Sequence, residues 1–149
     1  MSYFLQGILS FTAASAFGIV FNAPKNSLFY CGLVGMTGWL IYSFVDQLTS
    51  DPVKSSFAGA FTVAFVAHLM AKRFKMPMII FSVAGIIPLV PGGVAYTAMR
   101  HIVEKDYGLA IEFASLALMI SGAIAIGLVF AEIITKLLLR TIKKPKLKP

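Results

Sequence analysis

Five long apolar segments alternate with short polar breaks along the chain. The stretch from Asn22 to Asn26 separates the first two segments, a polar loop from Asp46 to Lys54 separates the next two, and a basic cluster from Lys72 to Lys75 closes the third. Each segment has about the 20 residues that a helix needs to cross a bilayer. The pattern predicts an all-α integral membrane protein with a single transmembrane domain over 1–149 and helices at about 3–21, 27–45, 56–74, 76–104 (broken at 88–93) and 107–139.

Two prolines and two glycines interrupt the fourth segment. Residues 88–93 read Pro-Leu-Val-Pro-Gly-Gly, directly after an almost wholly apolar run from Met76 to Val90. Proline removes a backbone donor and clashes with the preceding turn, so the helix is expected to stop or bend here. Because lipid cannot satisfy the freed backbone groups, a break at membrane depth must face protein or a water-filled cavity. Broken membrane helices often mark transport sites.

Composition supports the membrane assignment and excludes several functions. Hydrophobic residues make up 58% of the chain and charged residues only 13%, against roughly 25% charged in soluble domains. The net charge of +7 is concentrated in a basic tail at 140–149, which is typical of contact with anionic lipid rather than nucleic acid. The lone Cys31 predicts a packing role. No metal-ligand spacing or nucleophile–base pair is visible, so neither a cofactor nor enzyme activity is expected.

The basic residues also predict an orientation. With the C-terminus in the cytoplasm and five spans, ten Lys and Arg residues fall inside and three outside. Positive charge is enriched in cytoplasmic loops. The chain is therefore expected to place its N-terminus outside and its C-terminus in the cytoplasm.

The residues after the break could bind a small carboxylate. Pro91, Gly92 and Gly93 begin a predicted helix, whose free N–H groups and positive dipole end attract anions. Tyr96 and Arg100 follow Gly93 on the same helical face and could donate to the same ligand. The alternative is that the prolines only kink the helix and that Arg100 marks the outer interface.

Three more polar residues are candidates for the path. Asn22 either caps a turn or lines the cytoplasmic mouth. His68, inside the third span, is a candidate for proton coupling, although a hydrogen-bonded packing role is the plainer interpretation. Glu112 is the second proton-coupling candidate and could face an outer vestibule near Arg100.

Small residues recur along two of the predicted helices. Gly32, Gly35 and Gly38 are three apart, and Ala123, Gly127 and Ala131 are four apart. Such faces let helices approach closely in lipid. They predict either packing within the chain or an interface with another subunit.

Three motifs resemble the bacterial threonine/serine exporter family. These are Ile87-Pro-Leu-Val-Pro-Gly-Gly-Val-Ala-Tyr96, Phe17-Gly-Ile-Val-Phe-Asn-Ala-Pro-Lys25 and Gly32-Leu-Val-Gly-Met-Thr-Gly-Trp-Leu40. In this family one long chain, or a large and a small subunit, forms the exporter, and a related split pair is associated with succinate export. The chain resembles the small subunit, and some relatives have a polar residue where this chain has Gly93.

The resemblance implies a subunit of a secondary exporter in the bacterial inner membrane. It would move small carboxylates or hydroxy amino acids (threonine, serine or succinate) outwards, driven by the proton gradient, together with a large-subunit partner. Two alternatives are open: a non-transporting structural subunit that stabilises a larger transporter, and a homo-oligomeric pore.

Overall fold

The structure is a bundle of helices with a helical hairpin extending from one end. The computed structural model describes residues 3–142, with side chains from Tyr3 to Leu138, so the predicted basic tail at 140–149 lies outside the described side chains. The helices are α1 (Tyr3–Val20), α2 (Lys25–Thr49), α3 (Pro52–Phe74), α4 (Met78–Ile86), a 3-10 turn η1 (Ile87–Leu89), α5 (Gly92–Val103) and α6 (Tyr107–Ile142). The described residues form no strand, which confirms the predicted all-α class.

The number of membrane spans also agrees with the sequence. Four helices (α1, α2, α3 and α6) are long and apolar enough to cross a bilayer. The segments Met78–Leu89 and Gly92–Val103 form a fifth candidate span, bent by 49° between them. The predicted interruption of the fourth span is therefore confirmed.

One predicted boundary is wrong. The polar stretch from Asp46 to Lys54 is not a loop, because α2 continues to Thr49 and α3 begins at Pro52. The Asp51 carboxylate accepts hydrogen bonds from the backbone N–H groups of Val53 (3.0 Å) and Lys54 (3.4 Å), and proline is well tolerated at the first helical position. The Lys54 side chain also hydrogen-bonds to Asp51 and lowers the pKa of that carboxyl. These local interactions leave only Ser50 and Asp51 to turn the chain.

The bundle is held together by small residues where helices cross. A methyl group on Gly38 would collide with Val63 of α3, and one on Gly32 would collide with Phe11 and Ser15 of α1. On α6, Gly127 lies against the backbone of α3 at Phe57. Both predicted small-residue faces are therefore used for packing within the chain.

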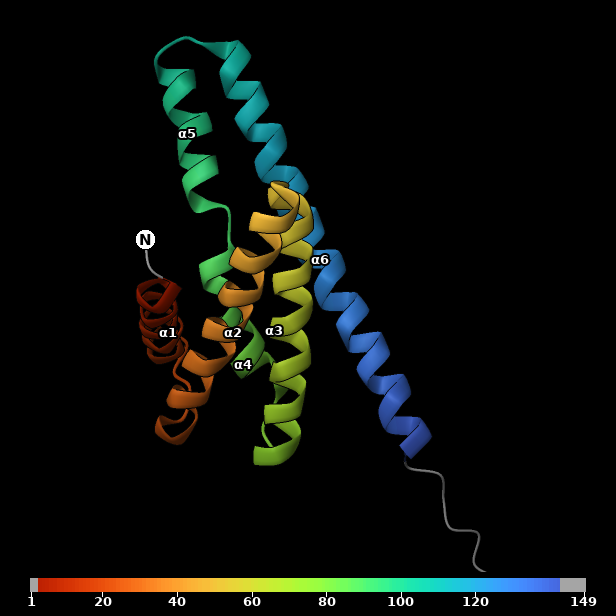
Figure 1. Ribbon diagram of the computed structural model, residues 1–149. Coiled ribbons are helices and arrows are strands. Elements are labelled where there is room, and N and C mark those ends of the chain that lie inside the picture. Colours follow the sequence, from red (N-terminus) through yellow and green to blue (C-terminus); the bar gives the residue numbers. More distant parts are fainter. Residues whose placement is uncertain (1–2, 143–149) are drawn as a thin grey trace, which may run out of the picture.

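The hairpin of α5 and α6 extends past the other helices. In Figure 1, α5 and the first half of α6 rise above the ends of α2 and α3, whereas the second half of α6 runs down beside α3. The main neighbour of α5 is α6, and Ala98 is the only buried residue of α5. The break between α4 and α5 thus lies where the bundle meets the hairpin.

Candidate functional site: the helix break and the cavities beside it

The bend between α4 and α5 is made by Val90 and Pro91 rather than by Pro88. Pro88 fits into the first turn of η1, where a missing N–H costs nothing. Val90 is extended (φ −61°, ψ 130°), as expected for a residue that precedes proline. Its extended backbone ends the helical hydrogen-bond series, and α5 begins at Gly92.

The break faces open space, which allows water to satisfy the freed backbone groups of a helix interrupted at membrane depth. Pro91 lines two cavities. The larger, about 500 Å³, lies between α5 and α6 and has an almost wholly apolar lining that includes Gly92. The smaller, about 220 Å³, lies toward α2 and α3 and is lined by Gly93 together with Trp39, Tyr42 and Ser56.

The two glycines at the break line different cavities. The Gly92 N–H donates to the Val90 carbonyl at 2.7 Å, so it is already engaged. No atom beyond their own helix lies within 4 Å of a methyl group placed on either Gly92 or Gly93. Gly93 is therefore the glycine at the break that combines free space with a place on the cavity toward α2.

Tyr96 and Arg100 point away from these cavities. Tyr96 is 70% exposed, and neither residue is among those that line the two cavities at the break. The Arg100 Nε pairs with the Glu104 carboxylate at 3.3 Å, on the surface of α5. The structure thus keeps Pro91, Gly92 and Gly93 together and places Tyr96 and Arg100 farther along the hairpin.

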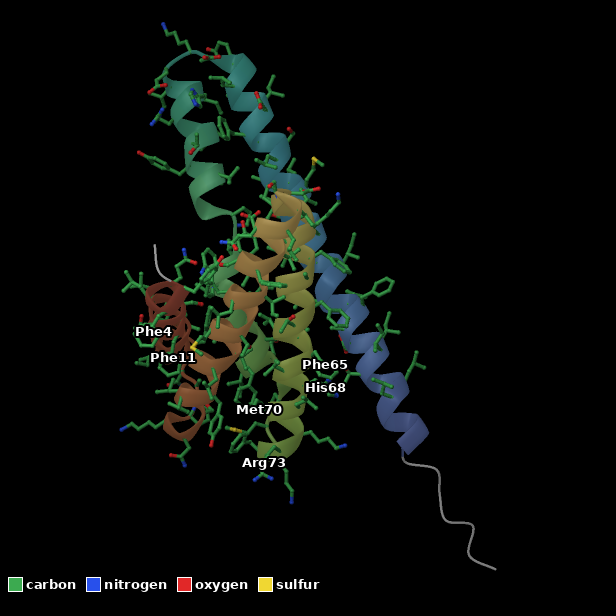
Figure 2. The ribbon with its side chains drawn as sticks, in the orientation of Figure 1. Phe4, Phe11, Phe65, His68, Met70 and Arg73 are labelled. Atoms are coloured by element: carbon green, nitrogen blue, oxygen red, sulfur yellow. The ribbon has the colours of Figure 1, made fainter. Side chains whose placement is uncertain are left out.

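The remaining candidates are separated from the break. Asn22 is exposed in the turn between α1 and α2 (φ 56°), at the opposite end of the bundle from the hairpin (Figure 1). Figure 2 shows His68 low on α3, on the side toward α6, where it lies within electrostatic reach of Glu132. Its Nδ1 is buried and has no hydrogen-bond partner among the described residues. Glu112 is exposed near the hairpin end of α6.

The structure adds a polar chamber that the sequence analysis missed. It has a volume of about 300 Å³, lies between the first turns of α1 and the last turns of α2, and is lined by Tyr3, Gln6, Trp39, Tyr42, Ser43, Asp46 and Gln47. The Ser43 hydroxyl donates to the Gln6 side-chain oxygen at 3.4 Å, which ties the two helices together. In the sequence, the side chains at positions 39, 42, 43 and 46 share one helical face, and this spacing could have indicated the chamber.

Trp39 connects this chamber to the break. Its ring stacks on Tyr42, with centroids 5.1 Å apart. Trp39 also lines the 220 Å³ cavity at the break and a further cavity of about 250 Å³ shared with Gln6 and Pro88. The three cavities therefore lie around one side chain, Trp39, and one of them reaches Pro91.

No group of three His, Cys, Asp or Glu side chains in the described part of the chain could hold a metal ion. The arrangement around Trp39 and the break can instead bind a small organic molecule by hydrogen bonds and apolar contacts. Pockets of this kind combine an apolar lining with a few placed polar groups.

Comparison with known proteins identifies relatives over most of the chain. The family described as Threonine/Serine exporter, ThrE, matches residues 6–134. The chain is 29% identical over 139 residues to a threonine/serine exporter of Corynebacterium glutamicum, and 30% identical over 91 residues to an uncharacterized protein of Haemophilus influenzae.

These alignments cover 93% and 61% of this chain but only 28% and 31% of the two relatives, so the chain spans less than a third of their length. No solved structure matches the chain at a significant level. The family match includes α1, the helix break and most of α6. The chain belongs to the threonine/serine exporter family.

Proposed function

We propose that this chain forms part of the solute path of a secondary exporter in the bacterial inner membrane. Its solutes would be small carboxylates or hydroxy amino acids such as threonine, serine or succinate. The observation that carries the proposal is the broken span, which faces two cavities at Pro91 and Gly93 instead of packed side chains. The name of the Corynebacterium relative supports the choice of solute.

Within this proposal, the solute binds first at the break and then passes outwards along the hairpin. Pro91, Gly92 and Gly93 would meet the solute first, and Tyr96 and Arg100 would meet it farther along the exposed face of α5. Asn22 would lie at the cytoplasmic mouth. His68 and Glu112 are the proposed proton-coupling residues, and the unpaired Nδ1 of His68 supports the first of these roles.

We also propose a partner and an orientation. On α5, large apolar side chains are exposed, among them Met99, Ile102 and Val103, and they would suit contact with another chain. We propose that this other chain is the large subunit of a split exporter, of which this chain would be the small subunit. The N-terminus would face outwards and the C-terminus the cytoplasm.

A leucine at Gly93 is expected to block export. The side chain would enter the 220 Å³ cavity at the break without colliding with the fold, because nothing lies within 4 Å of its first carbon. Gly122→Leu on α6 is the matched control, since Gly122 also has free space and lines a different cavity, together with Phe57 and Met119. Proteoliposomes with the chain alone, or with its large subunit, are loaded with labelled serine, threonine or succinate, and efflux is followed with and without a pH gradient.

We expect Gly93→Leu to reduce efflux at least about tenfold, since a filled site loses most of its binding free energy, while Gly122→Leu exports like the wild type. Equal efflux from both variants would contradict the solute path and favour a structural subunit. Efflux by the chain alone without a pH gradient would point instead to a homo-oligomeric pore.

A further inference from the structure

The polar chamber between α1 and α2 contains one carboxylate and no cation among its lining residues. Asp46 is half-buried, and its carboxylate accepts a long hydrogen bond from the Ser55 hydroxyl, 3.4 Å. The other lining side chains are tyrosine, glutamine, tryptophan and serine. The chamber therefore has a negative charge that the described residues do not balance.

Asp46 differs in this respect from the other acidic residues. Asp51, Glu104 and Glu132 each pair with a Lys or Arg on their own helix or turn, and the Asp106 carboxylate accepts from the Leu109 N–H at the start of α6. Glu112 is exposed to its surroundings. Of the six acidic residues, Asp46 alone lines one of the cavities around Trp39.

A second polar group, in the wall of the chamber, lacks a partner. The Trp39 indole Nε1 is buried and donates to no acceptor in the described structure. Burying a donor without an acceptor is costly, and such groups are usually satisfied by a ligand or water. The chamber thus offers a carboxylate for a cation. About two helical turns away along α2, its wall holds an indole N–H that is covered in this structure and that a rotation of the Trp39 ring would expose to an acceptor.

We infer that this chamber is an ammonium-binding subsite, in which Asp46 binds the amino group of the solute and the Trp39 ring turns so that its Nε1 donates to one of the solute oxygens. The stacked Trp39 and Tyr42 rings add favourable surroundings for a cation. A dicarboxylate would place two negative charges beside Asp46, so the chamber selects an amino acid and rejects succinate. The inference rests on the proposed transport function and narrows its solute class.

The chain contains a single tryptophan, and it lies in this chamber. Intrinsic fluorescence therefore reports on the chamber directly, without any transport step. The purified chain in lipid nanodiscs is titrated separately with L-serine, glycerate, ethanolamine, succinate and sodium chloride. Glycerate replaces the amino group of serine with a hydroxyl, and ethanolamine lacks the carboxylate.

Serine is expected to change the Trp39 emission in a saturable manner, ethanolamine more weakly, and glycerate and succinate not at all. Asp46→Asn, which keeps the acceptor for Ser55, should weaken serine binding by at least about tenfold, the usual cost of losing a charged hydrogen-bond partner. Asp46→Glu should restore part of the binding. Asp106→Asn is the matched control and should bind serine normally, because asparagine also caps a helix.

Equal responses to serine and glycerate, the same response to sodium ions as to serine, or normal binding by Asp46→Asn would overturn the inference. Unchanged circular dichroism of each variant shows that it is folded. Failure of this inference is distinguishable from failure of the transport proposal. Serine binding that depends on Asp46 but is not followed by export would refute only the transport proposal. Export without a Trp39 response would refute only the ammonium-binding subsite.

Discussion

Two glycines of α6 have opposite surroundings. A methyl group at Gly127 would lie 2.8 Å from the Phe57 carbonyl oxygen and 3.2 Å from the Ala60 Cβ, both on α3. A methyl group at Gly122, little more than one turn earlier, would have no atom beyond its helix within 4 Å. The contact between α3 and α6 therefore depends on Gly127 and not on Gly122.

Gly127→Ala is expected to destabilise the protein by about 1–3 kcal/mol, because the methyl group must push the α3 backbone away. Gly122→Ala should be neutral or stabilising by up to about 1 kcal/mol, because alanine favours helix. Thermal unfolding of both variants in the same detergent, followed by circular dichroism, compares them. Equal melting temperatures would show that α6 does not pack on α3 as described.

Only one of the two prolines near the bend between α4 and α5 causes it. Pro88 lies inside η1, whereas Pro91 holds Val90 in an extended conformation and lacks the N–H that a continuing helix needs. The two prolines are close in sequence but have different structural consequences. The bend is thus a property of Val90 and Pro91.

Pro91→Ala is expected to reduce the bend, and Pro88→Ala to leave it in place. Ile79 and Val103 are exposed at the two ends of the bent pair and suit spin labels. Straightening the 49° bend would lengthen the label-to-label distance by about 3 Å for helices of this length. Pulsed electron paramagnetic resonance measures this change. A longer distance in Pro88→Ala, with none in Pro91→Ala, would reverse the assignment.

Across the whole molecule, basic residues are concentrated at one end of the bundle, and Asp46 and Asp51 lie at the other. Lys25 and the basic residues at the end of α3 lie where α1 meets α2 and α3 meets α4, and Figure 2 shows Arg73 at this end. Asp46 and Asp51 lie at the other end of the bundle, and Lys105 lies at the tip of the hairpin. The excess of basic residues at the first end favours its placement in the cytoplasm.

Single cysteines can test this orientation. Cys31 is fully buried, so the wild-type chain should not react with a membrane-impermeant maleimide. In intact spheroplasts we expect Lys105→Cys to be labelled and Lys75→Cys to be labelled only after permeabilisation. The reverse pattern would show that the chain is inserted the other way round.

The sequence predicted the features that depend on neighbouring residues. The five apolar segments and the break are encoded in continuous stretches, and proline and glycine act on the backbone wherever they occur. The chamber around Trp39 could not be found in this way, because Gln6 reaches it from α1 and only the packing of α1 on α2 brings them together. The pairing of Arg100 with Glu104, in contrast, follows from their four-residue spacing.

The charges of α6 limit how much of the helix a bilayer can hold. Its long uncharged stretch, between Glu112 and Glu132, has 19 residues and is therefore about 28 Å long, which matches a hydrocarbon thickness of about 30 Å. The described helix is longer, with 32 residues over Tyr107–Leu138, so both of its ends extend beyond the hydrocarbon. We therefore expect the tip of the hairpin, up to Glu112, to lie among the lipid headgroups or in water.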